Sequence, residues 1–116
     1  MTWTNEDLEF FKSNLSGKVP HFSVSRSTLG GEATASVMML LCFDAKETWS
    51  NGIMENSRYM RIHVVHSGKV EHFGGSCGIK MRGFTSLDRS KVLAKILAHI
   101  AKVKELLDAF PNIDKY

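Results

Sequence analysis

The sequence lacks the features that mark secreted, membrane-spanning and zinc-scaffold proteins. Its longest apolar run, VMMLLCF from Val37 to Phe43, has seven residues, whereas a membrane-spanning helix needs about 20. The N-terminal stretch MTWTNEDLEF is polar and acidic, which does not predict a secretory signal. Cys42 and Cys77 have no neighbouring ligand spacing, so reduced thiols are favoured over a disulfide framework or a zinc knuckle. We therefore expect a cytoplasmic protein without a membrane partner.

Nucleotide-binding and nucleic-acid-binding signatures are also absent. The connection GGSCGIKMRGF, residues 74–84, is glycine-rich, but it contains neither a P-loop string nor GxGxxG. No RNP, KH or helix-turn-helix signature is present. Lys80 and Arg82 in this connection precede a predicted helix, and glycine-rich backbone with cations can hold phosphate. The alternative is a plain connector or a short fifth strand over residues 78–81.

The composition is that of one ordinary globular domain. The 116 residues are 43% hydrophobic and 23% charged, enough to bury a core without metals or disulfides. The formal net charge is +3. Residues 80–104 contain seven Lys or Arg against one Asp, which can attract a polyanion or an acidic protein, although such charge is also typical of a solvated helix face.

Two helices are predicted at the ends of the chain. The first covers about Asn5–Leu15, with Thr4 as N-cap, Asp7 capping back, and Trp3 and Leu8 in the two staple positions. The second covers about Leu87–Phe110, with Thr85 or Ser86 as cap and Pro111 after its end. Its apolar stripe comprises Val92, Ile96, Ile100, Val103, Leu107 and Phe110.

Between the helices, four stretches have strand character and are separated by hairpin-type dipeptides. The strands are expected at Pro20–Thr28, Glu32–Asp44, Ser57–His66 and Lys69–Gly74, with turns at Gly30-Gly31, Asn51-Gly52 and Ser67-Gly68. This order predicts an α+β fold of two layers, α-β-β-β-β-α, in which both helices cover one face of a four-stranded antiparallel meander.

Two-residue turns at these dipeptides fix the register of every hairpin, and all three give one consistent apolar face. The predicted pairs on that face are Phe43–Met60, Leu41–Ile62, Met39–Val64, Ile62–Phe73, Phe22–Met39 and Val24–Val37.

The same register defines a second, open face of the sheet, which the helices leave uncovered. It predicts a row formed by His21, Leu40, His63 and His72, with Tyr59 and Arg61 to one side. On the other side it predicts an apolar patch of Met38, Leu40, Val65 and Val70. A patch of this kind often marks an interface.

His63 and His72 are predicted to lie directly opposite each other, roughly 4.5–5.5 Å apart between Cβ atoms. Two imidazoles at that distance can share a zinc ion, with His21 as a third ligand only if the sheet bends. A role in acid–base catalysis lacks a neighbouring nucleophile or orienting carboxylate. His66, in the turn, and His99, on the flank of the last helix, are expected to be ordinary surface residues.

Three functions remain open, and we favour a binding protein without a cofactor over an enzyme. The first is a nucleic-acid-binding module that holds single strands or phosphate backbone. Its candidate contacts are Arg58, Tyr59, Arg61, Lys80, Arg82, Lys91, Lys95 and Lys102. The second is a homodimer or adaptor that pairs through the apolar patch. The third is a metal-binding protein or small enzyme that uses His63 and His72.

Overall fold

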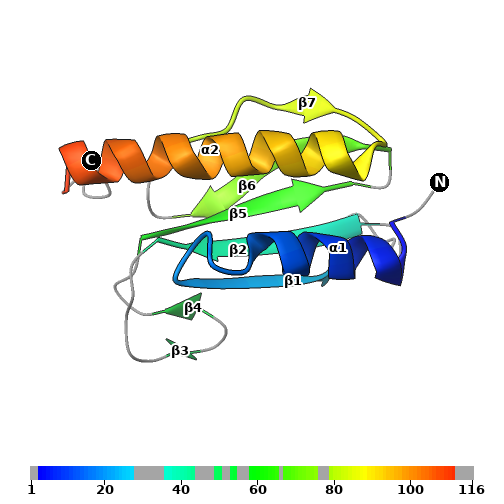
Figure 1. Cartoon of the computed structure of the whole chain (residues 1–116), viewed down its shortest axis with the longest axis horizontal. Coiled ribbons are helices and arrows are strands. Elements are labelled where there is room, and N and C mark those ends of the chain that lie inside the picture. The colour runs from blue at the N-terminus through cyan, green and yellow to red at the C-terminus, as the bar shows by residue number, and fades with distance from the viewer. Residues whose placement is uncertain are drawn as a thin grey trace.

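The computed structural model describes residues 3–27, 36–43, 49–50, 53–54, 58–65, 67–75 and 79–111. Two helices and a five-stranded antiparallel sheet form two layers (Figure 1). The elements of the sheet layer are β1 (His21–Ser27), β2 (Ser36–Cys42), β5 (Tyr59–Val64), β6 (Lys69–Gly75) and β7 (Phe84–Thr85), in that spatial order. The helices α1 (Asn5–Leu15) and α2 (Arg89–Ala109) lie on one side of this sheet, and a small ladder joins β3 (Trp49–Ser50) to β4 (Ile53–Met54).

The predicted α+β class and two-layer arrangement are confirmed, with one more strand in the sheet than predicted. The fifth strand is β7, which pairs with Lys69 and Val70. The sequence suggested a fifth strand over residues 78–81, whereas β7 comes three residues later in the chain. Residues 79–81 are irregular, and residues 76–78 lie outside the described part of the chain.

The first helix has the predicted bounds because its cap is a complete capping box. The Asp7 amide donates to the Thr4 hydroxyl at 3.1 Å, and the Thr4 amide donates to the Asp7 carboxylate at 2.8 Å. Each bond satisfies an amide that the helix itself leaves unpaired. Trp3 and Leu8 are both buried, and the Trp3 indole donates to the Val65 carbonyl at 2.9 Å.

The second helix begins at Arg89, later than predicted, because Asp88 supplies the cap. The Asp88 carboxylate accepts from the amides of Ser90 and Lys91, whereas Thr85, one of the two predicted caps, pairs in β7. The helix ends at Ala109. Phe110 lies beyond it and is 58% exposed, so its predicted place in the apolar stripe is wrong.

The main core lies between the helices and the face of the sheet that they cover. Alternate residues of β2 and β5 supply its centre, and Phe11, Leu15 and the buried stripe of α2 close it from above. These sheet residues are Val37, Met39, Leu41, Met60, Ile62 and Val64, all with 0% exposure.

The first two hairpins have registers displaced by two residues from the predicted ones. Val24 pairs with Met39, and Met39 pairs with Ile62. The residues of both predicted turns lie outside the described residues, but β3 and β4 pair Ser50 with Ile53, as a two-residue Asn51-Gly52 turn requires. Because side chains alternate along a strand, an even displacement keeps every residue on its predicted face.

The third hairpin differs by one residue between its turn and a bulge at Arg61/Ile62, and this reverses the faces of the first part of β6. Beyond the bulge, Arg61 pairs with Gly74 and Met60 with Gly75, as the predicted register requires. The Val65 amide donates to the Lys69 carbonyl at 2.9 Å, and the Gly68 amide donates to the Val65 carbonyl at 2.8 Å. Three residues therefore separate the paired positions, with Gly68 at a φ of 87° in the left-handed region, which is typical of a three-residue hairpin loop. The predicted two-residue Ser67-Gly68 turn is wrong.

An odd displacement exchanges the two faces of a strand. In the observed register Ile62 pairs with His72, His63 pairs with Glu71, and Val64 pairs with Val70. Val70 and His72 therefore belong to the helix-covered side, while Phe73 belongs to the second face. Their predicted places were the reverse.

Candidate functional site

The second face of the sheet carries an aromatic and cationic group on β5 and β6. Phe73 is 48% exposed. On the neighbouring strand the guanidinium carbon of Arg61 lies 5.7 Å from the centre of the Tyr59 ring, a cation–π contact. Lys69 and Glu71, at the N-terminal end of β6, form an ion pair with an N–O distance of 3.2 Å.

His63, on the same face, is buried and packs against the Phe73 ring. The two ring centres are 6.0 Å apart in an edge-on arrangement, the geometry that aromatic quadrupoles favour. Burial lowers the pKa of His63 below its usual value, and the nearby Glu71 carboxylate offsets part of this effect. The ring is therefore favoured in its neutral form, and it acts as an apolar neighbour of Phe73.

The apolar patch predicted on the second face is smaller than expected. Leu40 is 7% exposed and forms a separate small cluster with Cys42 and Tyr59. Met38 and Val65 are half-buried. The fourth predicted member, Val70, is fully buried in the main core instead.

The predicted histidine row does not form. His63 shares its row with Ser25 and Met38, whereas His21 pairs with Cys42 and lies in the row of Tyr59. His72 belongs to the opposite side of the sheet from His63, so the pairing on which the zinc prediction depended is absent. Within the described part of the chain, no three His, Cys, Asp or Glu side chains are grouped as metal ligands would be. Cys77 and His66 lie outside the described residues.

Four of the predicted phosphate-binding cations come together in a cleft of about 400 Å³ between residues 79–82 and α2, which we call the α2 cleft. Lys80 and Arg82 line one side of it, and Lys95 and Lys102 line the other. Lys95 also lies 5.5 Å from the centre of the Phe84 ring. Among the described residues that line the cleft, none carries a carboxylate.

One histidine, His99, lines the α2 cleft, and a second, His72, lies near it. His99 forms part of its wall and is only 9% exposed, so its expected surface position is wrong. Residues 79–82 turn back toward α2, and a hydrogen bond joins the backbone of Ile79 to the His99 ring. His72, from β6, is close enough to influence the charge of His99.

Both rings are favoured in the neutral form. Burial is the main cause of the lowered pKa of His99, followed by His72 and Lys102, and the Ile79 hydrogen bond offsets part of it. Burial also lowers the pKa of His72, and Lys80 adds to this effect. The Nε2 atoms of both rings are buried and have no hydrogen-bond partner among the described residues.

The remaining predicted cations lie elsewhere. Lys91 is exposed on α2 and is not among the residues lining the cleft. The Arg58 side chain donates to the Pro111 carbonyl at 2.9 Å, which ties the start of β5 to the end of α2. The candidate nucleic-acid contacts named from the sequence are thus divided between the second face, the α2 cleft, and the positions of Lys91 and Arg58.

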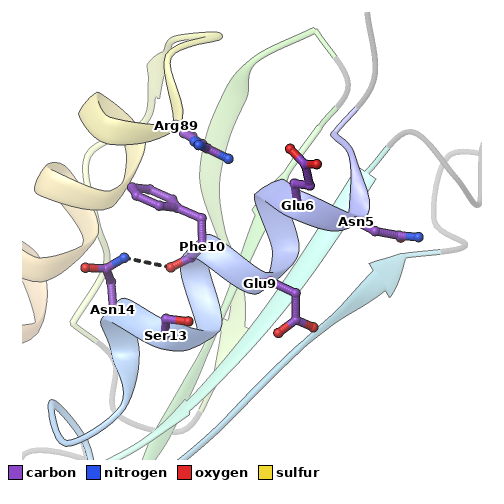
Figure 2. Close-up of a pocket in the computed structure, with 7 residues that line it drawn as sticks. All are labelled: Asn5, Glu6, Glu9, Phe10, Ser13, Asn14 and Arg89. Atoms are coloured by element: carbon purple, nitrogen blue, oxygen red, sulfur yellow. Dashed lines mark hydrogen bonds between the residues drawn. The ribbon is translucent and has the colours of Figure 1, made fainter.

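A second hollow, of about 470 Å³, lies on α1 and has the opposite character (Figure 2). Glu6 and Glu9 are on its α1 side, and Arg89 from α2 closes it. Arg89 is already engaged, because it forms a 3.2 Å ion pair with Asp7 and lies 4.6 Å from the centre of the Phe10 ring. This contact joins the two helices. Of the two carboxylates that line the hollow, Glu9 is paired with Lys12 at 3.4 Å.

Two candidate site residues, Phe73 and His99, were missed by reasoning from the sequence. A signal for Phe73 was present, because a glycine at position 68 also fits the last position of a three-residue loop between Val65 and Lys69. Nothing in the helical pattern distinguished His99 from an exposed flank residue, since its burial depends on residues 79–82.

In the described part of the chain, neither helix has the length and apolar character needed to cross a membrane. Comparison of the sequence with protein-family models and with curated proteins, and of the fold with solved structures, finds no match.

Proposed function

We propose that this protein is a small nucleic-acid-binding module that holds single strands on the second face of its sheet. The observation that carries the proposal is Phe73, which is 48% exposed on that face beside the strand that carries Tyr59 and Arg61. The sequence alone offered Tyr59 as the only well-placed aromatic, and the register of β6 supplies the second.

Two aromatic rings with an adjacent guanidinium are suited to unpaired bases. Bases stack on aromatic rings with about 1–3 kcal/mol each and with little sequence preference, and arginine contributes cation–π contacts and phosphate pairing. Arg61 lies over Tyr59 at 5.7 Å. Glu71, a carboxylate on the same face, is paired with Lys69, which reduces its repulsion of a polyanion.

The experiment is fluorescence anisotropy with labelled oligo(dT) and oligo(U) at about 50 mM salt, where phosphate contacts are strong. We expect binding that weakens as salt rises, and a loss of about 5–100-fold in affinity for Phe73→Ala, the value of one stacked base. Phe110→Ala is the matched control, because Phe110 is also an exposed phenylalanine but lies at the far end of α2. Its affinity should equal that of the unmodified protein.

Absence of binding at low salt would contradict the proposal. Equal losses in Phe73→Ala and Phe110→Ala would also contradict it, since they would show that the second face has no special role.

A homodimer that pairs through the same face is the second candidate. It is favoured by the small cluster of Leu40, Cys42 and Tyr59, which lies apart from the core beneath the helices, and by the half-buried Met38 and Val65 beside it. Light scattering should then give a dimer that Met38→Glu converts to monomer. A strict monomer at high concentration would rule this candidate out. The two candidates are compatible, because a dimer can bind nucleic acid across its seam.

A further inference from the structure

The α2 cleft differs from ordinary surface charge in how its cations are placed. Lys80 and Arg82 face Lys95 and Lys102 across a hollow of about 400 Å³, so the four positive groups can converge on one ligand. Like charges brought together repel one another unless an anion neutralises them. None of the four forms an ion pair with another described residue.

The separation of the two lysines on α2 indicates the size of the anion. Lys95 and Lys102 are two helical turns apart, which corresponds to about 10 Å along the axis at about 1.5 Å per residue. Lysine is a compact charge on a flexible stem, so such a pair can neutralise a ligand that carries its charge on several groups in a row. Arg82, on the other side, offers the planar fork that suits phosphate oxygens.

His99 lies in the wall of the same cleft. It is nine-tenths buried in the wall of the cleft, and its Nε2 atom has no hydrogen-bond partner among the described residues. Buried nitrogens in proteins nearly always have a partner. The hydrogen bond to the Ile79 backbone raises the pKa of the ring, so the ring donates it to the carbonyl. Nε2 of the neutral ring is then a buried acceptor, which leaves contact with an anion to the four cations.

The groups that influence the charge of His99 come from β6, from α2 itself and from residues 79–82. His72 approaches from β6, Lys102 is on its own helix, and the Ile79 backbone comes from the segment that covers it. Lys80 belongs to the same segment and acts on His72. All of these groups are neutral or positive, so an anion would meet no negative charge there.

We infer that the α2 cleft is a binding site for a compact ligand that carries two or more phosphate groups in sequence. It is a second site, formed by α2 and residues 79–82, and it does not rest on strand binding by the second face. Two sources share this chemistry, a free oligophosphate such as that of a nucleotide and the phosphates of a nucleic-acid backbone.

The experiment is isothermal titration of the whole protein with inorganic tripolyphosphate at low salt. The test variant is Lys95→Gln/Lys102→Gln, and the matched control is Lys91→Gln/Lys104→Gln, which removes the same charge from exposed positions of the same helix that do not line the cleft. We expect the test variant to lose about tenfold or more in affinity, the value of a charge-assisted phosphate contact, while the control stays within about twofold of the unmodified protein.

Two results would overturn the inference: no binding of tripolyphosphate by the unmodified protein, or equal losses in the test and control variants. Circular dichroism checks that both variants are folded. Competition by an oligonucleotide without terminal phosphates then identifies the source. Displacement of tripolyphosphate assigns the cleft to a nucleic-acid backbone, and lack of displacement assigns it to a free oligophosphate. Because Phe73→Ala should leave tripolyphosphate binding unchanged, failure of this inference and failure of strand binding are distinguishable.

Discussion

The two faces of the sheet are built from alternate residues of the same strands, yet they have different chemistry. On the helix-covered face, β2 and β5 contribute only apolar residues, and all of them are fully buried. On the second face β5 presents Tyr59, Arg61 and His63, while β2 presents Met38, Leu40 and Cys42. The difference shows which face the fold needs for stability. The residues of the second face do not pack against the helices, and those that are exposed, such as Phe73, are available for binding.

The strand β6 makes the comparison sharper, because one turn determines which of its residues lie on which face of the sheet. Its pairing places Val70 and His72 toward the helices and Glu71 and Phe73 on the second face. In the register predicted from the sequence, these four residues would lie on the opposite faces. The length of the turn at Gly68 therefore decides both which face gains an aromatic ring and whether His72 lies on the side of the sheet that α2 covers.

Two adjacent leucines of β2 test the comparison most strongly. Leu41 lies in the main core with 0% exposure, whereas Leu40 belongs to the small cluster on the second face. Leucine-to-alanine changes in cores cost about 2–5 kcal/mol, so we expect Leu41→Ala near the upper end of this range and Leu40→Ala near the lower end. Urea unfolding followed by circular dichroism measures both. Equal costs would break the comparison and indicate that the second face is covered in solution.

Gly68→Ala tests the turn that orients β6. The residue has a φ of 87°, and an added Cβ would lie 2.7 Å from the Ser86 carbonyl oxygen, so we expect a loss of about 1–3 kcal/mol in the free energy of unfolding. Gly17→Ala is the control, because its φ is similar at 80° but no atom lies within 4 Å of the added Cβ. A Gly17→Ala cost as large as that of Gly68→Ala would show that backbone strain alone, without the close approach, explains the effect.

Acidification should lower the stability of the protein mainly through His99, on the helix-covered side, and less through His63, on the second face. Burial lowers the pKa of His99 below 6.5 in the folded state, so the unfolded chain takes up protons first as the pH falls through about 6.5. Stability is therefore complete above this pH and is lost below it. We expect the melting temperature to fall between about pH 7.5 and about pH 5.5.

The variant His99→Leu should reduce this fall more than His63→Leu does. The reason is that His72 and Lys102 add to the lowering of the pKa of His99, whereas Glu71 opposes it for His63. Thermal melts of both variants at the two pH values make the measurement. A larger effect of His63→Leu would place the acid-sensitive group on the second face instead.

Phe73→Ala should have the smallest effect on stability. Phe73 is 48% exposed, whereas Phe11 is fully buried, so we expect less than about 1 kcal/mol for Phe73→Ala and about 3–5 kcal/mol for Phe11→Ala. The same urea titrations compare them. A large loss for Phe73→Ala would show that its ring is needed for packing, and its weakened binding could then no longer be read as lost stacking.

Local signals in the sequence were sufficient for the helices and for most of the sheet. The Thr4–Asp7 capping box and the regular apolar spacing of α2 are short-range features, and both helices formed where these features lie. The faces of β1, β2 and β5 were also predicted correctly, although their pairs were displaced by two residues. Only the parity of a register matters for a strand's faces.

The site was less predictable because its parts depend on contacts between distant segments. The sequence identified the four cations of the α2 cleft as phosphate-binding candidates, but nothing local indicated that residues 79–82 would face α2 across a hollow. The same contact buries His99. For Phe73 the error lay in a choice between two hairpin loops that the dipeptide Ser67-Gly68 fits equally well.

The three-residue turn before β6 also determines how this strand responds to one kind of genetic change. Loss of a single codon between Val65 and Lys69 would leave two residues to join the same Val65–Lys69 pair, and a tight two-residue turn would keep β6 on its present faces. If the shortened connection kept a three-residue loop instead, Lys69 would pair with Val64, and the strand would turn over with Phe73 toward the helices and His72 on the second face. A deletion of three nucleotides thus leaves the surface unchanged or exchanges an exposed aromatic ring for an imidazole, according to which loop forms, without altering any of the seven residues of β6.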